Sequence, residues 1–432
     1  MRTGIGFLAV IGAAVGVSSP AAAAPGGGAT GLRLGATGEI LYDSNQLRSG
    51  ASPSGRRDDV RYSPSGSILY DRLLGRGSVS VNGTAGYDFF QNNSFLNRNR
   101  FGAGVNLTGQ AGSRCSANVR ANYSNRQNGV GSLGNSTLLT PSRGVIAPNT
   151  IPVTDDLIPP DDIGRLIDNR QIVVSYGINA TCGAPGGRLS FGGGATHSSL
   201  DNGSPLRSFA NSNSNVYSLF AGLGVFRPGQ LQVNGSYSTI SYPNNLIVPG
   251  APVFPRNFNT GVKTYQAGLT YSRPIGNKLV GSVGLSYLTA RPGGGQQPYS
   301  APAYNISLSY RPGSRLSLAA TGARSVLSST GAGALYRVVD SVNLSAAYDI
   351  SPSISARANA GLTANNYKVP FAIPGEPARR SDSAKIVGLG VTYQPRPLYD
   401  VGFYVSQSFR SSNANILNYN STRASLTLSV RV

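Results

Sequence analysis

A period-2 alternation decides the fold, and residues 78–89 show it in the stretch SVSVNGTAGYDF. Val79, Val81 and Tyr87 fall on its odd positions, whereas Ser80 and Asn82 fall between them. Successive side chains of a β-strand point to opposite faces, so this stretch predicts a strand with one apolar and one polar face.

The same alternation recurs along the chain. It is found in residues 98–108, 231–239, 264–271, 304–311 and 425–432. After the first 24 residues there is no apolar run of about 20 residues that would form a spanning helix. Segments of about 10 alternating residues, separated by turn residues, are typical of transmembrane β-barrels.

The predicted connections alternate between short and long. Eight short turns rich in Pro, Gly or Ser fall at residues 73–76, 111–114, 183–187, 227–230, 273–278, 311–315, 350–353 and 394–397. Nine longer polar loops lie between them. This pattern predicts an all-β protein, a transmembrane antiparallel β-barrel of about 18 strands with both termini periplasmic. A water-soluble β-sandwich or β-solenoid would also alternate, but it would not need loop lengths that alternate throughout.

The composition excludes several classes of site. The 432 residues include one His, one Met, two Cys and no Trp, so zinc, haem and iron–sulfur sites cannot be assembled and we expect no cofactor. Lys and Arg number 37 against 17 Asp and Glu, a net charge of +20. Such a balance suits an anionic membrane, an anionic solute or nucleic acid.

The N-terminus predicts export. Arg2 precedes an apolar stretch from Ile5 to Val17 and a run of small residues from Ala21 to Ala24, which is the pattern of a secretory signal peptide. We expect cleavage after Ala23, so residues 1–23 are the signal peptide and residues 24–432 the barrel. Export removes nucleic acid from the expected partners and predicts the outer membrane, with its lipid and lipopolysaccharide.

The two cysteines test the predicted register. Cys115 opens the strand after one short turn, and Cys182 ends the next strand, both on the apolar face. Neighbouring antiparallel strands would bring them opposite each other, so we predict a Cys115–Cys182 disulfide. The alternative is two isolated small hydrophobic residues in lipid.

The polar face of the predicted strands carries an excess of arginine. Its predicted inward residues are Arg61, Arg98, Arg100, Arg120, Arg337, Arg357, Arg410, Arg423 and Arg431, against Asp71, Asp88, Asp349 and Asp400. Arginines that line a lumen would concentrate anions and repel cations, and their guanidinium groups match carboxylate and phosphate oxygens. The sequence therefore predicts an anion-preferring pore.

The longest predicted loop, an extracellular loop over residues 127–169, is rich in acids. It carries Asp155, Asp156, Asp161 and Asp162, followed by Asp168. The loop could fold into the lumen as a constriction, hold a divalent cation, or remain a solvated surface loop. Catalysis has little support, because His197 is the single imidazole and no nucleophile elbow or phosphate-binding loop occurs. We expect no enzymatic activity.

The start of the barrel resembles a known family. Residues 39–48, EILYDSNQLR, and 58–66, DDVRYSPSG, are similar to the entry of outer-membrane β-barrels often encoded beside exopolysaccharide biosynthesis genes. The resemblance covers the whole predicted barrel in length and strand number. It implies a part in secreting or assembling an extracellular polysaccharide with periplasmic machinery, and the architecture is similar to that of alginate-type exporters. One departure is the last residue, Val432, where many barrels end in an aromatic residue.

Three functions follow as expectations. The leading one is a conduit or assembly component for secretion of an acidic exopolysaccharide. The alternatives are a general diffusion pore for small anionic solutes and a non-conducting structural barrel of the cell surface.

Overall fold

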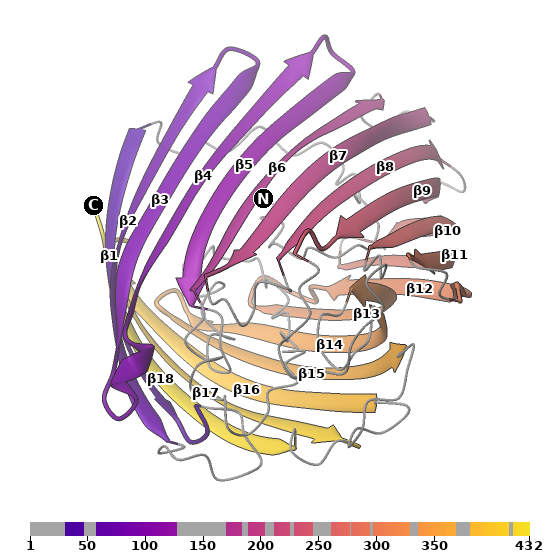
Figure 1. The fold of residues 1–432 in the computed structure, drawn as a ribbon. Coiled ribbons are helices and arrows are strands. Elements are labelled where there is room, and N and C mark those ends of the chain that lie inside the picture. Colours follow the sequence, from indigo (N-terminus) through magenta and orange to yellow (C-terminus); the bar gives the residue numbers. More distant parts are fainter. Residues whose placement is uncertain are drawn as a thin grey trace.

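The protein forms a closed β-barrel, seen along its interior in Figure 1. The computed structural model describes residues 31–46, 58–127, 170–183, 189–203, 211–224, 229–244, 261–276, 278–293, 297–328, 336–368, 381–413 and 418–432. The predicted signal peptide and the acids of the predicted loop 127–169, which are Asp155, Asp156, Asp161, Asp162 and Asp168, lie outside these residues.

Eighteen strands form the wall. They are β1 (Gly31–Asp43), β2 (Asp59–Leu74), β3 (Gly77–Phe90), β4 (Arg98–Ala111), β5 (Cys115–Gln127), β6 (Arg170–Gly183), β7 (Leu189–Asn202), β8 (Ser212–Gly224), β9 (Gln230–Ser241), β10 (Val262–Ile275), β11 (Leu279–Pro292), β12 (Tyr299–Tyr310), β13 (Leu316–Ser328), β14 (Tyr336–Ser351), β15 (Ile354–Lys368), β16 (Ser381–Arg396), β17 (Tyr399–Ser412) and β18 (Tyr419–Arg431). A short 3-10 helix, η1 (Ser94–Leu96), follows β3. No helix in this part of the chain is long and apolar enough to cross a membrane.

Each strand pairs antiparallel with the next one along the chain, and β1 also pairs with β18. The predicted strand number and the closed antiparallel topology are confirmed. Eight connections join strands at one end, the short-turn end, and nine lie at the other, the long-loop end. Gly75 and Gly112 turn the chain at the short-turn end with φ of 54° and 70°, in a left-handed conformation that other residues rarely adopt.

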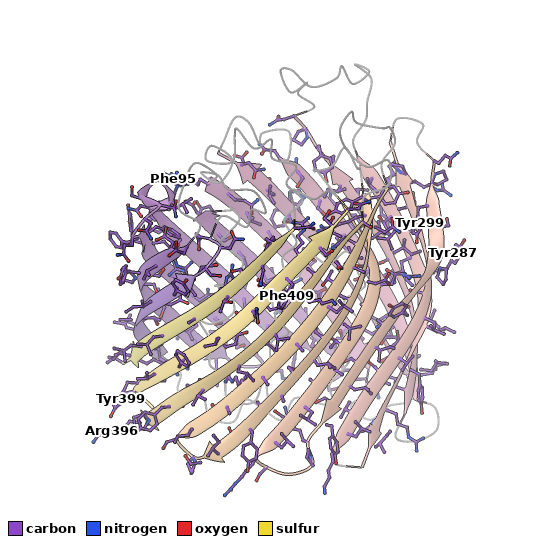
Figure 2. All side chains as sticks on the ribbon, turned by 90° about the horizontal axis from the view of Figure 1, so that it is seen from below. Phe95, Tyr287, Tyr299, Arg396, Tyr399 and Phe409 are labelled. Atoms are coloured by element: carbon purple, nitrogen blue, oxygen red, sulfur yellow. A yellow bond between two sulfur atoms is a disulfide. The ribbon has the colours of Figure 1, made fainter. Side chains whose placement is uncertain are left out.

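The outer surface is apolar. Leu219, Leu285 and Leu389 are 73%, 67% and 63% exposed, and most of the inward residues beside them are small or polar, such as Ser218, Ser286 and Gly388. Leucines this exposed on every side of a barrel would be unfavourable in water but are suited to hydrocarbon. Figure 2 shows the side chains that cover this outer face. A closed barrel satisfies its backbone within the wall and can stand in lipid, so the protein is located in the outer membrane.

Nine residue pairs close the barrel between β1 and β18, from Gly35–Arg431 to Asp43–Arg423. Leu34 and Val432 extend this contact by exchanging two backbone hydrogen bonds of 2.9 and 2.8 Å. The C-terminal Val432, which departs from the aromatic residue of many barrels, therefore takes part in closure through its backbone.

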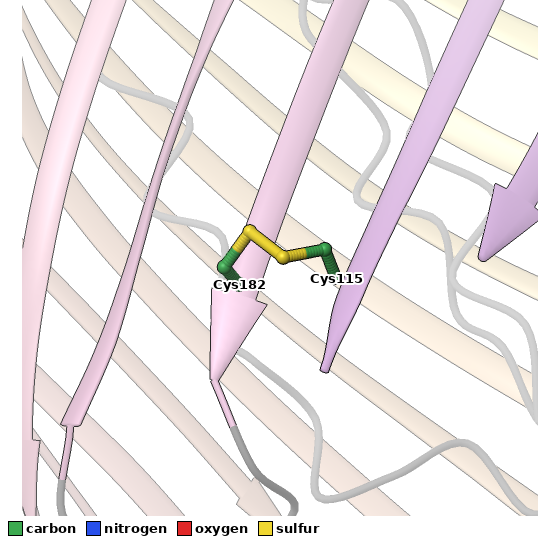
Figure 3. Close-up of a disulfide and its surroundings, with 2 residues drawn as sticks. All are labelled: Cys115 and Cys182. Carbon is green, nitrogen blue, oxygen red and sulfur yellow. A yellow bond between two sulfur atoms is a disulfide. The ribbon is translucent and has the colours of Figure 1, made fainter. Parts of the chain in front are cut away.

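The predicted disulfide is present. Cys115 opens β5 and Cys182 lies near the end of β6, directly opposite in the register, with their Cα atoms 4.0 Å apart (Figure 3). The two residues are 67 positions apart in the chain. The bridge therefore joins the strands on either side of the longest connection.

Replacing both cysteines, as Cys115→Ser with Cys182→Ser, should lower the free energy of unfolding. The bridge closes a loop of 67 residues, and its loss should cost up to about 4 kcal/mol because the unfolded chain gains freedom. Urea unfolding in lipid vesicles, followed by tyrosine fluorescence, measures the change. Reductant should destabilise the native protein and leave the double variant unchanged; equal urea midpoints for both would contradict the prediction.

Candidate functional site

The interior wall is divided into a charged part and a neutral part. Inward side chains of β14–β18 and β1–β5, here called the charged wall, include every ionisable Arg, Asp or Glu that faces the lumen among the described residues. The inward face of β6–β13, the neutral wall, has none among these residues. Among the residues that the structure describes, a solute in the lumen would therefore meet charge on one side only.

Hydroxyl and amide groups cover much of the neutral wall. Gln266 donates to Ser286 Oγ at 2.7 Å, and Gln230 donates to Ser190 Oγ at 2.8 Å. Ser238 and Thr264 are buried on the same face. Such groups can exchange hydrogen bonds with water or with a polar solute without attracting one sign of charge.

Ion pairs between neighbouring strands organise the charged wall. Arg61 of β2 donates to Glu39 of β1 at 2.9 Å, and Arg423 of β18 donates to Asp43 of β1 at 2.8 Å. Arg410 of β17 is paired with Asp382 of β16. Asp43 and Asp382 are 0% and 3% exposed. Buried charges of this kind are tolerated only when they are paired and hydrogen-bonded.

The remaining pairs continue this pattern toward both ends. Arg431 of β18 donates to Asp400 of β17 at 2.6 Å, and Arg100 of β4 lies 3.3 Å from Asp88 of β3. Asp88 also accepts a hydrogen bond of 2.5 Å from Ser63. Two of the predicted inward charged residues, Asp88 and Arg100, thus fall in one cluster with Ser63 on β2–β4, and Arg61 is close to Ser63 in sequence.

A carboxylate at the long-loop end holds the chain after β3. Asp59 is 1% exposed and accepts hydrogen bonds from the backbone N–H groups of Asn92 and Asn93 at 2.9 Å. The Asn93 side chain adds a third at 2.7 Å. Asp59 therefore anchors the segment that leads into η1.

The predicted lumen arginines fall on the charged wall but in different surroundings. Arg98, Arg100 and Arg120 lie on β4 and β5, and Arg337 lies over the Tyr367 ring at 5.9 Å. Arg357 of β15 is exposed, and no carboxylate lies within ion-pair distance of it among the described residues. Their contact with a solute stays a prediction.

The predicted charge balance of the lumen is wrong. The structure places four further acids on the inward face, which are Glu39, Asp43, Asp59 and Asp382, and it adds Arg33, paired with Asp71 near the short-turn end. The inward face of the described residues thus has a small excess of arginine over acids rather than the large one predicted. Most of these arginines neutralise a carboxylate on the next strand.

Alternation did not identify these acids as inward residues because they lie at strand ends or within the stretches 39–48 and 58–66 that carry the family resemblance. Asp43 is the last residue of β1, and Asp382 is the second residue of β16. Glu39 and Asp43 lie one and three residues from Ile40, whose side chain is exposed on the outer face. Because side chains alternate along a strand, both acids must face the interior.

The residues that carry the family resemblance make structural contacts. Asp43 accepts hydrogen bonds from the Asn45 backbone at 3.0 Å and from Ser421 at 2.6 Å, which ties the end of β1 to β18. Ser63 donates to Asp88. These motif residues stabilise the start and the closure of the barrel.

His197 lies on the outer face of β7. Its ring stacks on Tyr176 with centroids 4.9 Å apart, and Nδ1 is 2.8 Å from Asn215 Oδ1. No described carboxylate or hydroxyl contacts it in the arrangement that a nucleophilic triad requires.

Neither a protein-family model nor a curated protein sequence matches the chain. The barrel is similar to the solved structure of Pseudomonas aeruginosa OpdK with vanillate, with 11% identity, a TM-score of 0.46 and coverage of 93% of this chain and 99% of that chain. It is also similar to P. aeruginosa OccK5 (OpdH), with 11% identity, a TM-score of 0.45 and coverage of 93% and 98%. A third similar structure is the P. aeruginosa siderophore receptor PirA, with 11% identity, a TM-score of 0.44 and coverage of 93% and 80%. Similarity at this level leaves the solute unassigned.

Replacing Asp43 with Asn should destabilise the barrel far more than the same change at Asp71. Asp43→Asn leaves the guanidinium of Arg423, whose side chain is 14% exposed, without its carboxylate, and loss of one member of a buried pair costs about 3 kcal/mol or more. Asp71 pairs with Arg33, whose side chain is 50% exposed, so Asp71→Asn should cost less than about 1 kcal/mol. Urea titration of both variants in vesicles compares them, and equal losses would contradict the burial argument.

Proposed function

We propose that the barrel is an outer-membrane diffusion channel for small polar solutes with a modest preference for anions. The observation that carries the proposal is the two-part interior, in which a wall of paired charges faces a wall of hydroxyl and amide groups. A water-filled lumen bounded in this way offers hydrogen bonds throughout and holds few charges that would trap an ion.

The anion preference rests on the residual arginine excess. Paired charges cancel at a distance, so the lumen potential depends on guanidinium groups that are not matched by a carboxylate. Arg357 is the clearest of these among the described residues, since it is exposed and lies three residues into β15 from the short-turn end. An anion entering or leaving at that end would pass its guanidinium group.

Secretion of an acidic exopolysaccharide is the second candidate. Its support is the resemblance of residues 39–48 and 58–66 to barrels encoded beside exopolysaccharide genes. The paired charged wall favours small solutes over an acidic polymer, because a polyanion would need a continuous row of unmatched cations. Assay of surface polysaccharide after deletion of the gene separates the two functions.

Planar-bilayer recording tests the channel and its charge. The native protein should conduct, with a reversal potential that reports more permeation by chloride than by potassium. Arg357→Gln should lower the ratio of anion to cation permeability, by roughly twofold, since one guanidinium is removed from the lumen. Lys385→Gln is the matched control, because Lys385 is exposed opposite Leu362 and Phe409 on the outer face.

Lys385→Gln should leave the permeability ratio unchanged. A native channel that prefers cations would overturn the anion preference. Absence of conductance would overturn the channel and favour a structural barrel.

A further inference from the structure

The hydrogen-bonded ladder between β12 and β13 covers only part of the two strands. Their ladder runs from Tyr310–Leu318 to Asn305–Ala323, which is six residue pairs, whereas the β1–β18 closure has nine. Toward the long-loop end, residues 299–304 of β12 pair with β11, and residues 324–328 of β13 pair with β14. We call the boundary between residues 299–304 and residues 324–328 the seam.

On the long-loop side of this ladder, the edge of the wall formed by β12 and the edge formed by β13 overlap. Val338 lies four residues before Val342 in β14, and Val326 is its ladder partner in β13, so all three side chains lie on the same face of the sheet. Val342 is 45% exposed on the outer face, whereas Val326 and Val338 are only 2% and 5% exposed. They join an apolar cluster with residues on the inward face of β10–β12, namely Val262, Leu288, Ala290 and Ala303. The outer face of β13–β14 therefore packs against the inner face of β10–β12.

Side chains make contact across the seam. Where the seam meets the six-pair ladder, Tyr304 of β12 donates to Asp340 Oδ1 of β14 at 3.1 Å. Arg324 of β13, the ladder partner of Asp340, holds this carboxylate in place by donating to both of its oxygens at 2.7 and 3.0 Å. Arg324 also lies over the Tyr304 ring at 5.7 Å. Closer to the long-loop end, the ring centroids of Tyr299 and Tyr336 are 6.1 Å apart. Tyr299 is labelled in Figure 2.

This kind of closure opens more easily than a β-ladder. Separating two hydrogen-bonded strands in lipid would leave rows of backbone N–H and C=O groups without partners, at several kcal/mol each. Separating the seam displaces apolar contacts, which an apolar guest can replace, together with one tyrosine hydrogen bond. Movement of β13–β14 would uncover Val262, Leu288, Ala290 and Ala303 on the lumen side.

The surroundings of the seam fit an acyl chain with an anionic headgroup. On the short-turn side of the seam, the outer face has an apolar hollow of ≈ 530 Å³, lined by residues that include Leu308, Leu318, Ala320 and Leu344. At the long-loop end of the neighbouring strands, Lys263 and Arg291 are exposed on the outer face, and neither pairs with a carboxylate among the described residues. The seam thus lies between the hollow and these cations, so an acyl chain whose headgroup is at Lys263 and Arg291 would extend along the seam toward the hollow.

We propose that the β12–β13 seam is a lateral gate, shown here closed, through which the acyl chain of a single-chain anionic amphiphile passes between the bilayer and the apolar cluster in the wall. The occupant comes from the membrane, because the route is dry and apolar and a polar solute would lose its hydration there. The gate is independent of the diffusion channel, since it uses a different path and a different class of ligand.

Cysteine accessibility tests whether the seam opens. Ala303→Cys places a thiol in the cluster. Ala384→Cys places one at an inward site of β16 that is also buried, with 8% exposure against 3% for Ala303, and where ladders continue on both sides. In phospholipid vesicles, dodecylmaleimide should modify the first variant at least about tenfold faster than the second, because local opening exposes it. The native cysteines are bridged and do not react.

A sulfonated maleimide should show no such difference, because it does not enter from the bilayer. Equal rates of dodecylmaleimide modification at the two sites would overturn the gate. Heat-dependent mobility on gels confirms that both variants are folded.

Locking the seam provides the second test. Tyr299→Cys with Tyr336→Cys, bridged by a bismaleimide, should reduce photolabelling of the barrel by a diazirine palmitate about tenfold. The control is Tyr217→Cys with Tyr237→Cys, whose native rings are 6.2 Å apart across the continuous β8–β9 ladder. Bridging this control should leave the labelling unchanged.

Undiminished labelling of the locked barrel would overturn the gate. Small-ion conductance of the same locked barrel should equal that of the control. Loss of labelling without loss of conductance supports the gate, and absence of conductance in every variant would count against the diffusion channel alone.

Discussion

In lipid, every backbone N–H and C=O group of a spanning segment must find its partner within the protein. The rest of this structure depends on that constraint. It requires β18 to return to β1, and the nine pairs between them, extended by the backbone of Leu34 and Val432, complete the ring. Once the ring is closed, alternation along each strand sends apolar side chains to the bilayer and polar ones inward. The outer-membrane location follows from the same geometry.

Closure also decides how charge is distributed. Inward arginines and carboxylates lie on adjacent strands, where they can pair across the ladder, as Arg61 does with Glu39 and Arg423 with Asp43. These pairs help to hold β18, β1 and β2 together at the point where the chain ends meet. Charged residues are thus structural on one side of the lumen, and the neutral wall on β6–β13 leaves the other side free for polar contact. The proposed channel uses this asymmetry.

The wall departs from the constraint at one place among the described residues. Between β12 and β13 the ladder ends after six pairs, and overlap of two apolar faces replaces it. Val326 and Val338 are buried in one apolar cluster with Leu288 and Ala303, so packed apolar side chains cover this boundary. A boundary sealed by packing can separate and reseal, which a hydrogen-bonded ladder in lipid does not do readily.

The sequence by itself determined the barrel, its strand number and the disulfide. Alternation and loop lengths report local geometry, and in a hairpin of matched strands the register follows from them, so Cys115 could be placed opposite Cys182. Tertiary structure alone decided which charges pair and where the wall overlaps. Asp43 meets Ser421 and Arg423 only because the ring closes, and these residues are almost the whole chain apart. The run Tyr336-Arg337-Val338-Val339 breaks the alternation, with both valines buried, but whether both faces are covered depends on how distant strands pack.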